Sequence, residues 1–429
     1  MKNNHYKKFL LKMFDEAVLI SHPKNLMKKY IPNKQPSGKT IVIGAGKASA
    51  EMARVFELAW ISKGYKKLEG IVVTRYGHKR KCKNIKIIEA SHPVPDKSGL
   101  DATNDIINLL KPLNSKDLVI VLISGGGSSL LVSPIDKISL KEKQDLTNEL
   151  LRSGATISEI NAVRKHLSNV KGGKLASFAY PAEVITLAIS DVPGDDFGTI
   201  ASGPTYPDHT TNKDAIEVLS KYNIVCSKNI DDVLRSNKYE TPKQKDKIFK
   251  NSEFNIIAKP QNALLKAAKV AERKNFNTLV LSDSIEGESN DVGLVHAAIV
   301  KQVIRFGQPA KKPLCILSGG ETTVTINKEN GKGGRNTQFL LSLVIALGSS
   351  SNVYAIACDT DGIDGSEDNA GAIIFPDTLE RAYSKGLNPK NYLERNDAYS
   401  FFNILGDIVK IGPTHTNVND FRAILITND

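Results

Sequence analysis

Short apolar runs rich in β-branched residues alternate with helical patterns along the first half of the chain. TIVIGAG at 40–46 is followed by an amphipathic stretch at 47–60, and LVIVLI at 118–123 follows another at 100–113. Strands that are apolar throughout are typical of a largely parallel sheet with a helix between successive strands. We therefore predict an α/β fold with a Rossmann-like N-terminal domain. Ligands of such sheets bind beyond the carboxyl ends of the strands, so we look for function in the loops there.

The apolar periodicity is lost around 206–252, where the sequence becomes polar and lysine-rich. A second series of apolar runs and helical patterns follows. We predict two α/β domains, over residues 1–240 and 250–429, with the active site in the cleft between them. The N-terminal segment predicts an amphipathic first helix, and FRAILITND predicts a closing strand at the edge of the second sheet.

Two loops after apolar strands have the composition of an anion site. The first places Lys47 at the start of a helix, where its charge adds to the positive end of the helix dipole. The second, SGGGSS at 124–129, combines glycines, whose N–H groups can converge on an anion, with hydroxyl donors. A tight turn without a ligand is the alternative at each. The residues of these loops that we assign to cofactor binding are Gly44, Gly46, Ser124, Gly125, Gly126, Gly127, Ser128 and Ser129.

A third loop is acidic. The strand EVITLAI at 183–189 opens into SDVPGDDFGTIASGPT, which contains Asp191, Asp195 and Asp196. Glycine and proline indicate sharp turns, and carboxylates there indicate that a cation or a proton is handled. We expect this loop to lie beside the other two if the three strands are neighbours.

Glycine-rich loops recur in the second half of the chain. In LSGGETTVTI a strand ends at Gly319 and Gly320, and Glu321 begins another, which predicts a tight hairpin beside a functional loop. GKGGRNTQF presents Arg335 at the start of a helix, where its guanidinium suits a transferring phosphoryl group or a carboxylate. We predict that these residues face the cofactor.

CDTDGIDG places Asp359, Asp361 and Asp364 among glycines. The segment lacks the glutamate and the flanking helices of an EF-hand, which favours magnesium or substrate hydroxyls over calcium. We assign Asp359 and Asp361 to cofactor binding, and a plain aspartate-rich turn is the alternative.

Two features remain open. His92, in EASHPVPDKSG, fits either a catalytic base or a structural side chain. The segment NAVRKHLSNVKGGKLA at 161–176 fits either a phosphate-facing helix end or a solvated basic face. Its basic residues are Arg164, Lys165, His166, Lys171 and Lys174.

Composition narrows the class of protein. No apolar run approaches the roughly 20 residues of a membrane span, so we expect a soluble protein without a membrane partner. The net charge of +12 comes mainly from lysines scattered along the chain, which argues against a nucleic-acid partner. The four cysteines form no CxxC pair, which argues against a zinc site or a disulfide framework and fits a reducing cytoplasm. A monomer and a homodimer both remain open.

Anion-binding turns, isolated cations and acidic loops suit phosphoryl transfer, which depends on positioning and charge neutralisation. In that chemistry Mg²⁺ shields the nucleotide phosphates, and a carboxylate takes the proton of the acceptor hydroxyl. The sequence has no Ser-His-Asp order, no GxxxxGK[ST] motif and no protein-kinase motif set. The known nucleotide motifs therefore do not identify the enzyme.

Eight motifs together resemble those of the glycerate 2-kinase family, whose C-terminal part is the MOFRL domain. They are VIGAGKAS, SGGGSSLL, KHLSNVKGGKLA, SDVPGDDFGTIASGPT, SGGETTVT, GKGGRNTQ, DTDGIDG and GPTHTNVNDF. The resemblance extends from about residue 5 to the end, with the MOFRL region at about 312–420. It implies a two-domain cytoplasmic enzyme that uses ATP and Mg²⁺ to convert D-glycerate to 2-phosphoglycerate. Members have also been labelled hydroxypyruvate reductases.

The resemblance also assigns roles to three residues. The family's functional lysine matches Lys47, its acidic residue matches Asp191 and its arginine matches Arg335. We expect Lys47 and Arg335 to stabilise the transferring phosphoryl group or the glycerate carboxylate. Asp191 is expected to act on the acceptor hydroxyl or, with Asp195, to bind Mg²⁺.

Two other functions are alternatives. A nicotinamide-dependent hydroxypyruvate reductase would use the GAG turn for the cofactor and Arg75 for a 2′-phosphate. A non-catalytic sugar-acid-binding protein would keep the fold and bind its ligand without turnover.

Overall fold

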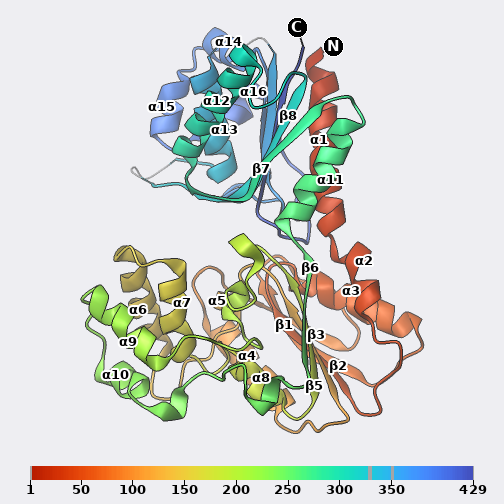
Figure 1. Ribbon diagram of the computed structural model, residues 1–429, viewed down its shortest axis with the longest axis vertical. Helices are drawn as coiled ribbons and strands as arrows, with labels where there is room; N and C mark the ends of the chain where they lie inside the picture. Colours follow the sequence, from red (N-terminus) through yellow and green to blue (C-terminus); the bar gives the residue numbers. More distant parts are fainter. Residues whose placement is uncertain (1, 327–330, 349–351, 429) are drawn as a thin grey trace. The chain divides into compact units, whose positions relative to one another are not determined.

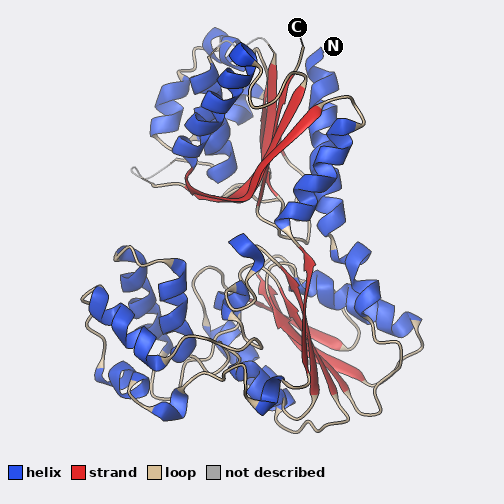
Figure 2. Ribbon diagram, in the orientation of Figure 1, coloured by secondary structure: helices blue, strands red, loops and turns tan. Residues whose placement is uncertain are grey.

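The computed structural model describes residues 2–326, 331–348 and 352–428, and the chain divides into two compact units. The Rossmann-like unit is Leu26–Ile257, and the composite unit joins Met1–Asn25 to Ala258–Asp429. Each unit has a six-stranded sheet with helices packed on it (Figures 1 and 2). The predicted α/β fold is confirmed.

The sheet of the Rossmann-like unit has the order β3-β2-β1-β4-β5-β6, and its first five strands pair in parallel. This order is typical of doubly wound dinucleotide-binding sheets. The apolar runs predicted as strands form β1 and β4, whose residues are all buried, because both faces of the sheet are covered by helices. The strands are β1 (Thr40–Ala45), β2 (Leu68–Arg75), β3 (Ile85–Ala90), β4 (Leu118–Ile123), β5 (Glu183–Ile189) and β6 (Ser252–Ala258).

Helices cover both faces of this sheet (Figure 1). Helix α3 (Ser49–Ser62) packs on one face, and α4 (Lys97–Leu110) packs on the other together with α5 (Gly127–Leu130) and α8 (Lys174–Ala179). A separate hydrophobic cluster holds four more helices together beside the sheet. They are α6 (Leu140–Arg152), α7 (Ile157–His166), α9 (Asn212–Lys221) and α10 (Lys228–Leu234). The short helix α2 (Pro23–Leu26) precedes this unit.

The composite unit has a mixed sheet with the order β11-β10-β9-β12-β8-β7. Strands β7 and β8 are parallel, and the other paired neighbours are antiparallel. The strands are β7 (Asn277–Glu288), β8 (Leu314–Thr323), β9 (Val353–Asp359), β10 (Gly371–Ile374), β11 (Ile408–Val409) and β12 (Asp420–Ile426).

Two predictions about these strands were wrong. Strand β12 is central, between β9 and β8, and every one of its residues is buried, which fits its apolar sequence better than an edge does. Gly319 and Gly320 do not make a hairpin, because β8 continues through them to Thr323 and pairs with β12 on one side and β7 on the other. The glycines allow close approach: a Cβ atom on Gly320 would collide with the backbone of Ile285.

Helices cover both faces of the mixed sheet as well (Figure 1). On one side are α12 (Ser289–Phe306), α13 (Arg335–Leu347), α14 (Thr378–Ser384), α15 (Pro389–Glu394) and α16 (Ala398–Leu405). On the other side, α1 (Lys2–Ser21) packs against α11 (Pro260–Glu272). The ring centroids of Phe14 in α1 and Phe421 in β12 lie 5.7 Å apart.

The division of the chain differs from the predicted domains 1–240 and 250–429, because α1 packs on the second sheet. The predicted amphipathic helix is present, and its apolar stripe, which includes Leu10, Met13 and Phe14, is buried. The stripe shows that the helix needs a partner, but periodicity does not say which sheet supplies it. Among the described residues, no helix is long and apolar enough to span a membrane.

Candidate functional site

Three loops meet at the carboxyl edge of the Rossmann-like sheet, after β1, β4 and β5. These strands are neighbours, as the sequence analysis required. The register aligns Ala45 with Ile123 and Ile123 with Ala188, so Lys47, Gly125 and Asp191 follow at the same level of the edge to within one residue. Since adjacent strands lie roughly 4.8 Å apart, β1 and β5 are separated by about 10 Å, with β4 and its glycine loop between them.

The loop after β1 is joined to the loop after β4 by hydrogen bonds. The Lys47 N–H donates to the Gly125 carbonyl oxygen at 2.8 Å, and the Ala48 N–H donates to Ser124 Oγ at 3.0 Å. Ser49 Oγ and Ser124 Oγ are 3.0 Å apart. Gly46 has a φ of 148°, and a Cβ atom there would collide with Ser124 Oγ, so this close approach requires glycine. The contacts fix Lys47 immediately before α3.

The glycines of the 124–129 loop also have a packing function. Gly126 has a φ of 79°, and a Cβ atom on it would lie 2.9 Å from His92 Nε2. The His92 ring, whose role the sequence left open, therefore lies against this loop. The three hydroxyls make internal hydrogen bonds: Ser124 as above, Ser129 to the Gly126 carbonyl at 3.0 Å, and Ser128 to Ser202 at 2.8 Å.

The basic segment 161–176 is not a solvated face. Lys165 and Lys171 are buried, and Lys165 forms an ion pair of 3.1 Å with the buried Asp208. Arg164 and Lys171 both donate to Ser128, at 2.9 and 3.1 Å. The segment therefore packs against the glycine-rich loop, and α7 carries Arg164 in its last turn. The other interpretation, a phosphate-facing helix end, stays a prediction.

Local hydrogen bonds stabilise the turns of the acidic loop after β5. Asp196 accepts from the Gly198 N–H at 3.2 Å and from Thr199 Oγ1 at 2.7 Å. Asp191 and Asp195 are half-buried, and Asp195 has a φ of 57° in the left-handed region. Asp196 is therefore committed to the turn. The chemical roles of Asp191 and Asp195 stay predictions from the sequence.

In the composite unit, Arg335 lies at the start of α13 among three carboxylates. Its guanidinium contacts Glu321 at 2.6 Å, Asp359 at 2.8 Å and Asp420 at 2.7 Å. Although burial opposes the charge, these carboxylates hold the pKa of Arg335 well above its usual value. The guanidinium is thus permanently charged and fixed in direction. The sequence did not foresee that this arginine is so fully paired.

Asp364, from the aspartate-rich segment, caps α13 rather than facing solvent. Its carboxylate accepts from the N–H groups of Asn336 and Thr337, both at 2.9 Å, and burial raises its pKa. Asp361 accepts from the Ile363 N–H at 2.9 Å. The predicted binding functions of Asp359 and Asp361 remain predictions.

Asp420 and Arg422 were missed as members of this cluster. Asp420 also accepts from Asn336 Nδ2 at 2.7 Å and from Arg422 Nη2 at 2.5 Å, and both charged side chains are fully buried. The signal was present in NDFRAILI: an acid and a base two residues apart lie on one face of an otherwise apolar strand, which indicates an internal ion pair.

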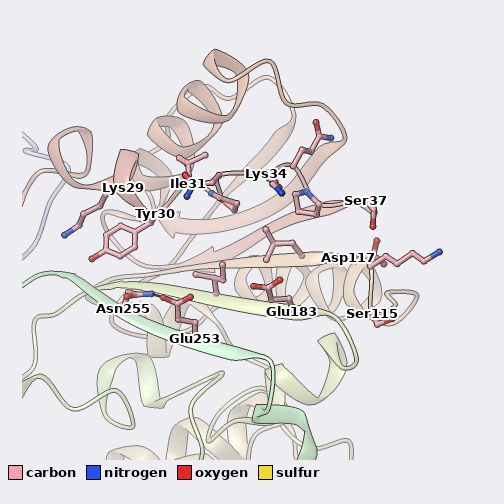
Figure 3. A pocket seen from close by; sticks show the side chains of 17 residues that line it. Lys29, Tyr30, Ile31, Lys34, Ser37, Ser115, Asp117, Glu183, Glu253 and Asn255 are labelled. Atoms are coloured by element: carbon pink, nitrogen blue, oxygen red, sulfur yellow. Dashed lines mark hydrogen bonds between the residues drawn. The ribbon is translucent and has the colours of Figure 1, made fainter.

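Within residues 2–326, 331–348 and 352–428, no three His, Cys, Asp or Glu side chains are grouped as a metal site. A pocket of about 610 Å³ lies at the opposite edge of the Rossmann-like sheet (Figure 3). Its walls carry Lys34, Glu183 and Glu253, near the starts of the strands rather than their carboxyl ends. Ligands of parallel sheets bind at the carboxyl ends, so we assign the site to the three loops and not to this pocket.

Comparison with known proteins gave two family matches. Residues 9–235 match a family described as "Domain of unknown function (DUF4147)", and residues 314–420 match the MOFRL family. The chain is 40% identical to D-glycerate 2-kinase of Thermotoga maritima over 98% of both chains. It is 48% identical to an Agrobacterium vitis protein named "Putative hydroxypyruvate reductase", over 98% of this chain and 94% of that one.

A solved structure is similar over the whole chain. The crystal structure of glycerate kinase from Thermotoga maritima aligns with a TM-score of 0.88 and 39% sequence identity, covering 99% of this chain and all of that one.

Proposed function

The chain belongs to the glycerate 2-kinase family, and from this we propose that it transfers the γ-phosphoryl group of ATP to O2 of D-glycerate, releasing ADP and 2-phosphoglycerate. The resemblance drawn from short motifs is confirmed by these comparisons. The observation that carries the proposal is the meeting of the Lys47, glycine-rich and Asp191 loops on three neighbouring strands.

Asp191 acts on the acceptor in this proposal. As O2 of glycerate bonds to the γ-phosphorus, the bond from that phosphorus to the β,γ-bridging oxygen breaks and the hydroxyl proton passes to the Asp191 carboxylate. The separation of about 10 Å between β1 and β5, the strands that carry the Lys47 and Asp191 loops, leaves room for a phosphoryl group and a small acid. Lys47 and the glycine-rich loop neutralise the phosphates.

The residues fit Mg²⁺ bound with the nucleotide. Magnesium takes one or two carboxylates and completes its shell with water and substrate phosphates, so a full cage of protein ligands is not needed. Asp191 and Asp195 are carboxylates of one loop and supply that number of ligands. When bound, the ion would neutralise phosphate charge.

Arg335 has a less direct role than the sequence analysis assigned to it. Three carboxylates already hold its guanidinium, so a phosphate or a substrate carboxylate would have to compete with the half-exposed Glu321. We propose that an incoming anion displaces Glu321 and keeps the two buried partners.

The predicted cleft between the domains stays a prediction. Cytoplasmic residence is also proposed, and the four free cysteines support it.

The reductase remains the second candidate because of the Agrobacterium relative's name and the strand order of the Rossmann-like sheet. The turn does not favour it: Ser49 occupies the third glycine position of the dinucleotide fingerprint and begins α3. A sheet order shared with dinucleotide-binding proteins does not establish function.

The test is an assay of the purified protein with D-glycerate, ATP and Mg²⁺. ADP release is followed with a coupling enzyme, and phosphorus NMR identifies the phosphorylated oxygen. Hydroxypyruvate with NADPH is measured in parallel. We expect ADP release with phosphate on O2 and no NADPH oxidation. NADPH consumption without ADP release would establish the reductase and remove the roles of Lys47 and Asp191.

A further inference from the structure

The Ser128 side chain is the centre of a polar network that the phosphoryl-transfer proposal does not use. Arg164 Nη2 and Lys171 Nζ lie 2.9 and 3.1 Å from Ser128 Oγ, and Ser202 Oγ lies 2.8 Å away. Lys171 Nζ also donates to the Ser128 carbonyl oxygen at 2.6 Å. Ser202 donates to Asn161 Oδ1 at 3.2 Å.

This network uses the full hydrogen-bonding capacity of Ser128. A hydroxyl group offers one hydrogen and two lone pairs. Because Ser202 gives its hydrogen to Asn161, Ser128 donates to Ser202, and its lone pairs accept from Arg164 and Lys171. Ser128 therefore has nothing left for a ligand. Its function is to hold the Arg164 guanidinium in a fixed position by one nitrogen, which leaves that side chain's other N–H groups for other partners.

The charges around Ser128 have one sign. Burial, followed by the charges of Arg164 and Lys143, holds the pKa of Lys171 well below its usual value. Lys165 is paired with Asp208, but in the part of the chain that the structure describes no carboxylate forms an ion pair with Arg164, Lys171 or Lys143. Buried cations are costly unless they are paired. An anion bound at Arg164, a partly exposed residue, would supply the missing charge.

The position of the network indicates which anion this is. Ser202 belongs to the loop after β5, which also carries Asp191, the group that acts on the acceptor hydroxyl under the proposed function. The carboxylate of glycerate is attached to the carbon that bears O2, so it must lie next to that hydroxyl. Under the proposed function, Lys47 and the backbone N–H groups of the glycine-rich loop bind the phosphates. Arg164 has the planar geometry that recognises a carboxylate with two hydrogen bonds.

We propose that Arg164, positioned by Ser128 and Lys171, binds the carboxylate of D-glycerate and so selects 2-hydroxy acids over neutral polyols. The assignment rests on the proposed function for the identity of the ligand. Arg164 would contact substrate, whereas Ser128 and Lys171 act through Arg164 as positioning residues.

The test compares Arg164→Gln with the wild type on D-glycerate and on D-glyceramide, the neutral amide of the same acid. We expect kcat/KM for D-glycerate to fall at least about 10-fold, the usual effect of losing a charged hydrogen bond, and kcat/KM for D-glyceramide to change less than about 3-fold. KM for ATP should be unchanged. Arg152→Gln is the matched control, because it removes the same charge from the exposed end of α6 and should leave all these constants at their wild-type values.

Each other outcome has a definite meaning. Equal losses on both acceptors would make Arg164 structural, and a rise in KM for ATP alone would assign the network to the nucleotide; either result overturns the proposal. If Arg164→Gln does not fold, Arg164→Lys keeps the charge and should still lose discrimination between acid and amide. If the wild type has no kinase activity, the proposed function fails separately. Calorimetry with D-glycerate then decides whether Arg164 binds a carboxylate, because binding must be lost in the variant.

Discussion

Asp196 holds the turn of the acidic loop through both of its carboxylate oxygens, whereas Asp191, in the same loop, is the carboxylate that the proposed function makes the general base. The proposed general base can therefore be separated from a structural neighbour. We expect Asp191→Asn to fold normally and to lose at least about 100-fold in kcat, the usual contribution of a positioned base. Asp196→Asn should keep kcat within a few-fold, because an amide oxygen can still accept from the Gly198 N–H. Circular dichroism and steady-state kinetics on both variants make the comparison; wild-type turnover in Asp191→Asn would remove this residue from the mechanism.

The burial of Lys143 near other cations lowers the free energy of unfolding of the protein. Burial, then the charges of Arg164 and Lys174, lower its pKa to about 7, whereas in the unfolded chain it stays near 10.5. The unfolded state therefore binds more protons between these values, and the free energy of unfolding rises with pH across that interval. At pH 7, Lys143→Met should raise the free energy of unfolding by about 2–4 kcal/mol, a gain that shrinks toward pH 10.

Urea unfolding at pH 7 and pH 10 measures this difference. Lys141→Met, at an exposed position of the same helix that pairs with Asp145, is the control, and its effect should stay below about 1 kcal/mol at both values. An equal gain at both pH values for Lys143→Met would mean that packing and not charge is responsible.

At the scale of the element, the apolar pattern predicted which segments form strands better than it predicted the position of each strand in its sheet. β12 was predicted from the apolar run in FRAILITND, but its place in the sheet depends on residues far along the chain, such as Arg335, which pairs with Asp420. The Gly319–Gly320 pair suggested a turn because glycine marks turns most often. Here the absence of a side chain on Gly320 allows β7 to approach β8 closely, and only the tertiary structure reveals this contact.

The loops after β1, β4 and β5 were predictable because each follows an apolar run directly and chain order placed them at the same edge. The hydrogen bonds that Ser124, Ser128 and Ser129 make within the protein were not predictable. Composition does not show whether a hydroxyl group binds a ligand or another part of the protein.

Asp420, the residue of β12 that pairs with Arg335, allows a prediction about the stability of the protein. Asp420 is buried and joins Arg335, Asn336 and Arg422, whereas Glu321 is 49% exposed. Asp420→Asn leaves a buried arginine without its counter-charge and should lower the free energy of unfolding by about 3–5 kcal/mol. Glu321→Gln should cost less than about 1 kcal/mol, because an exposed pair contributes little. Urea unfolding followed by far-UV circular dichroism measures both, and equal effects would contradict the assigned difference in burial.

At the scale of the whole molecule, the sequence predicted two domains but not the unit to which the first helix belongs. The amphipathic pattern of α1 is satisfied by any apolar surface, and chain order suggested the nearer one. The pairing of Phe14 with Phe421 and the ion pair of 3.1 Å between Glu16 and Lys266 instead join α1 to the composite unit.

The single tryptophan makes this division measurable, because Trp60 is buried in α3 of the Rossmann-like unit. Removing residues 2–21 uncovers the sheet face under α1, so we expect the composite unit to melt at least about 10 °C lower. The thermal transition reported by Trp60 fluorescence should stay within about 2 °C of its original midpoint. Far-UV circular dichroism records the other transition. A shift of equal size in both signals would show that α1 supports the Rossmann-like unit.

The shared location of α1 and β12 also bears on how the protein is made. α1 leaves the ribosome more than two hundred residues before its packing partner α11, which at about 5–20 residues per second is a delay of roughly 10–50 seconds, and β12 follows later still. The Rossmann-like unit has all its strands by then and can fold while translation continues. α1 meanwhile exposes an apolar stripe, and transiently exposed apolar surface of this kind favours aggregation until its packing partners are made.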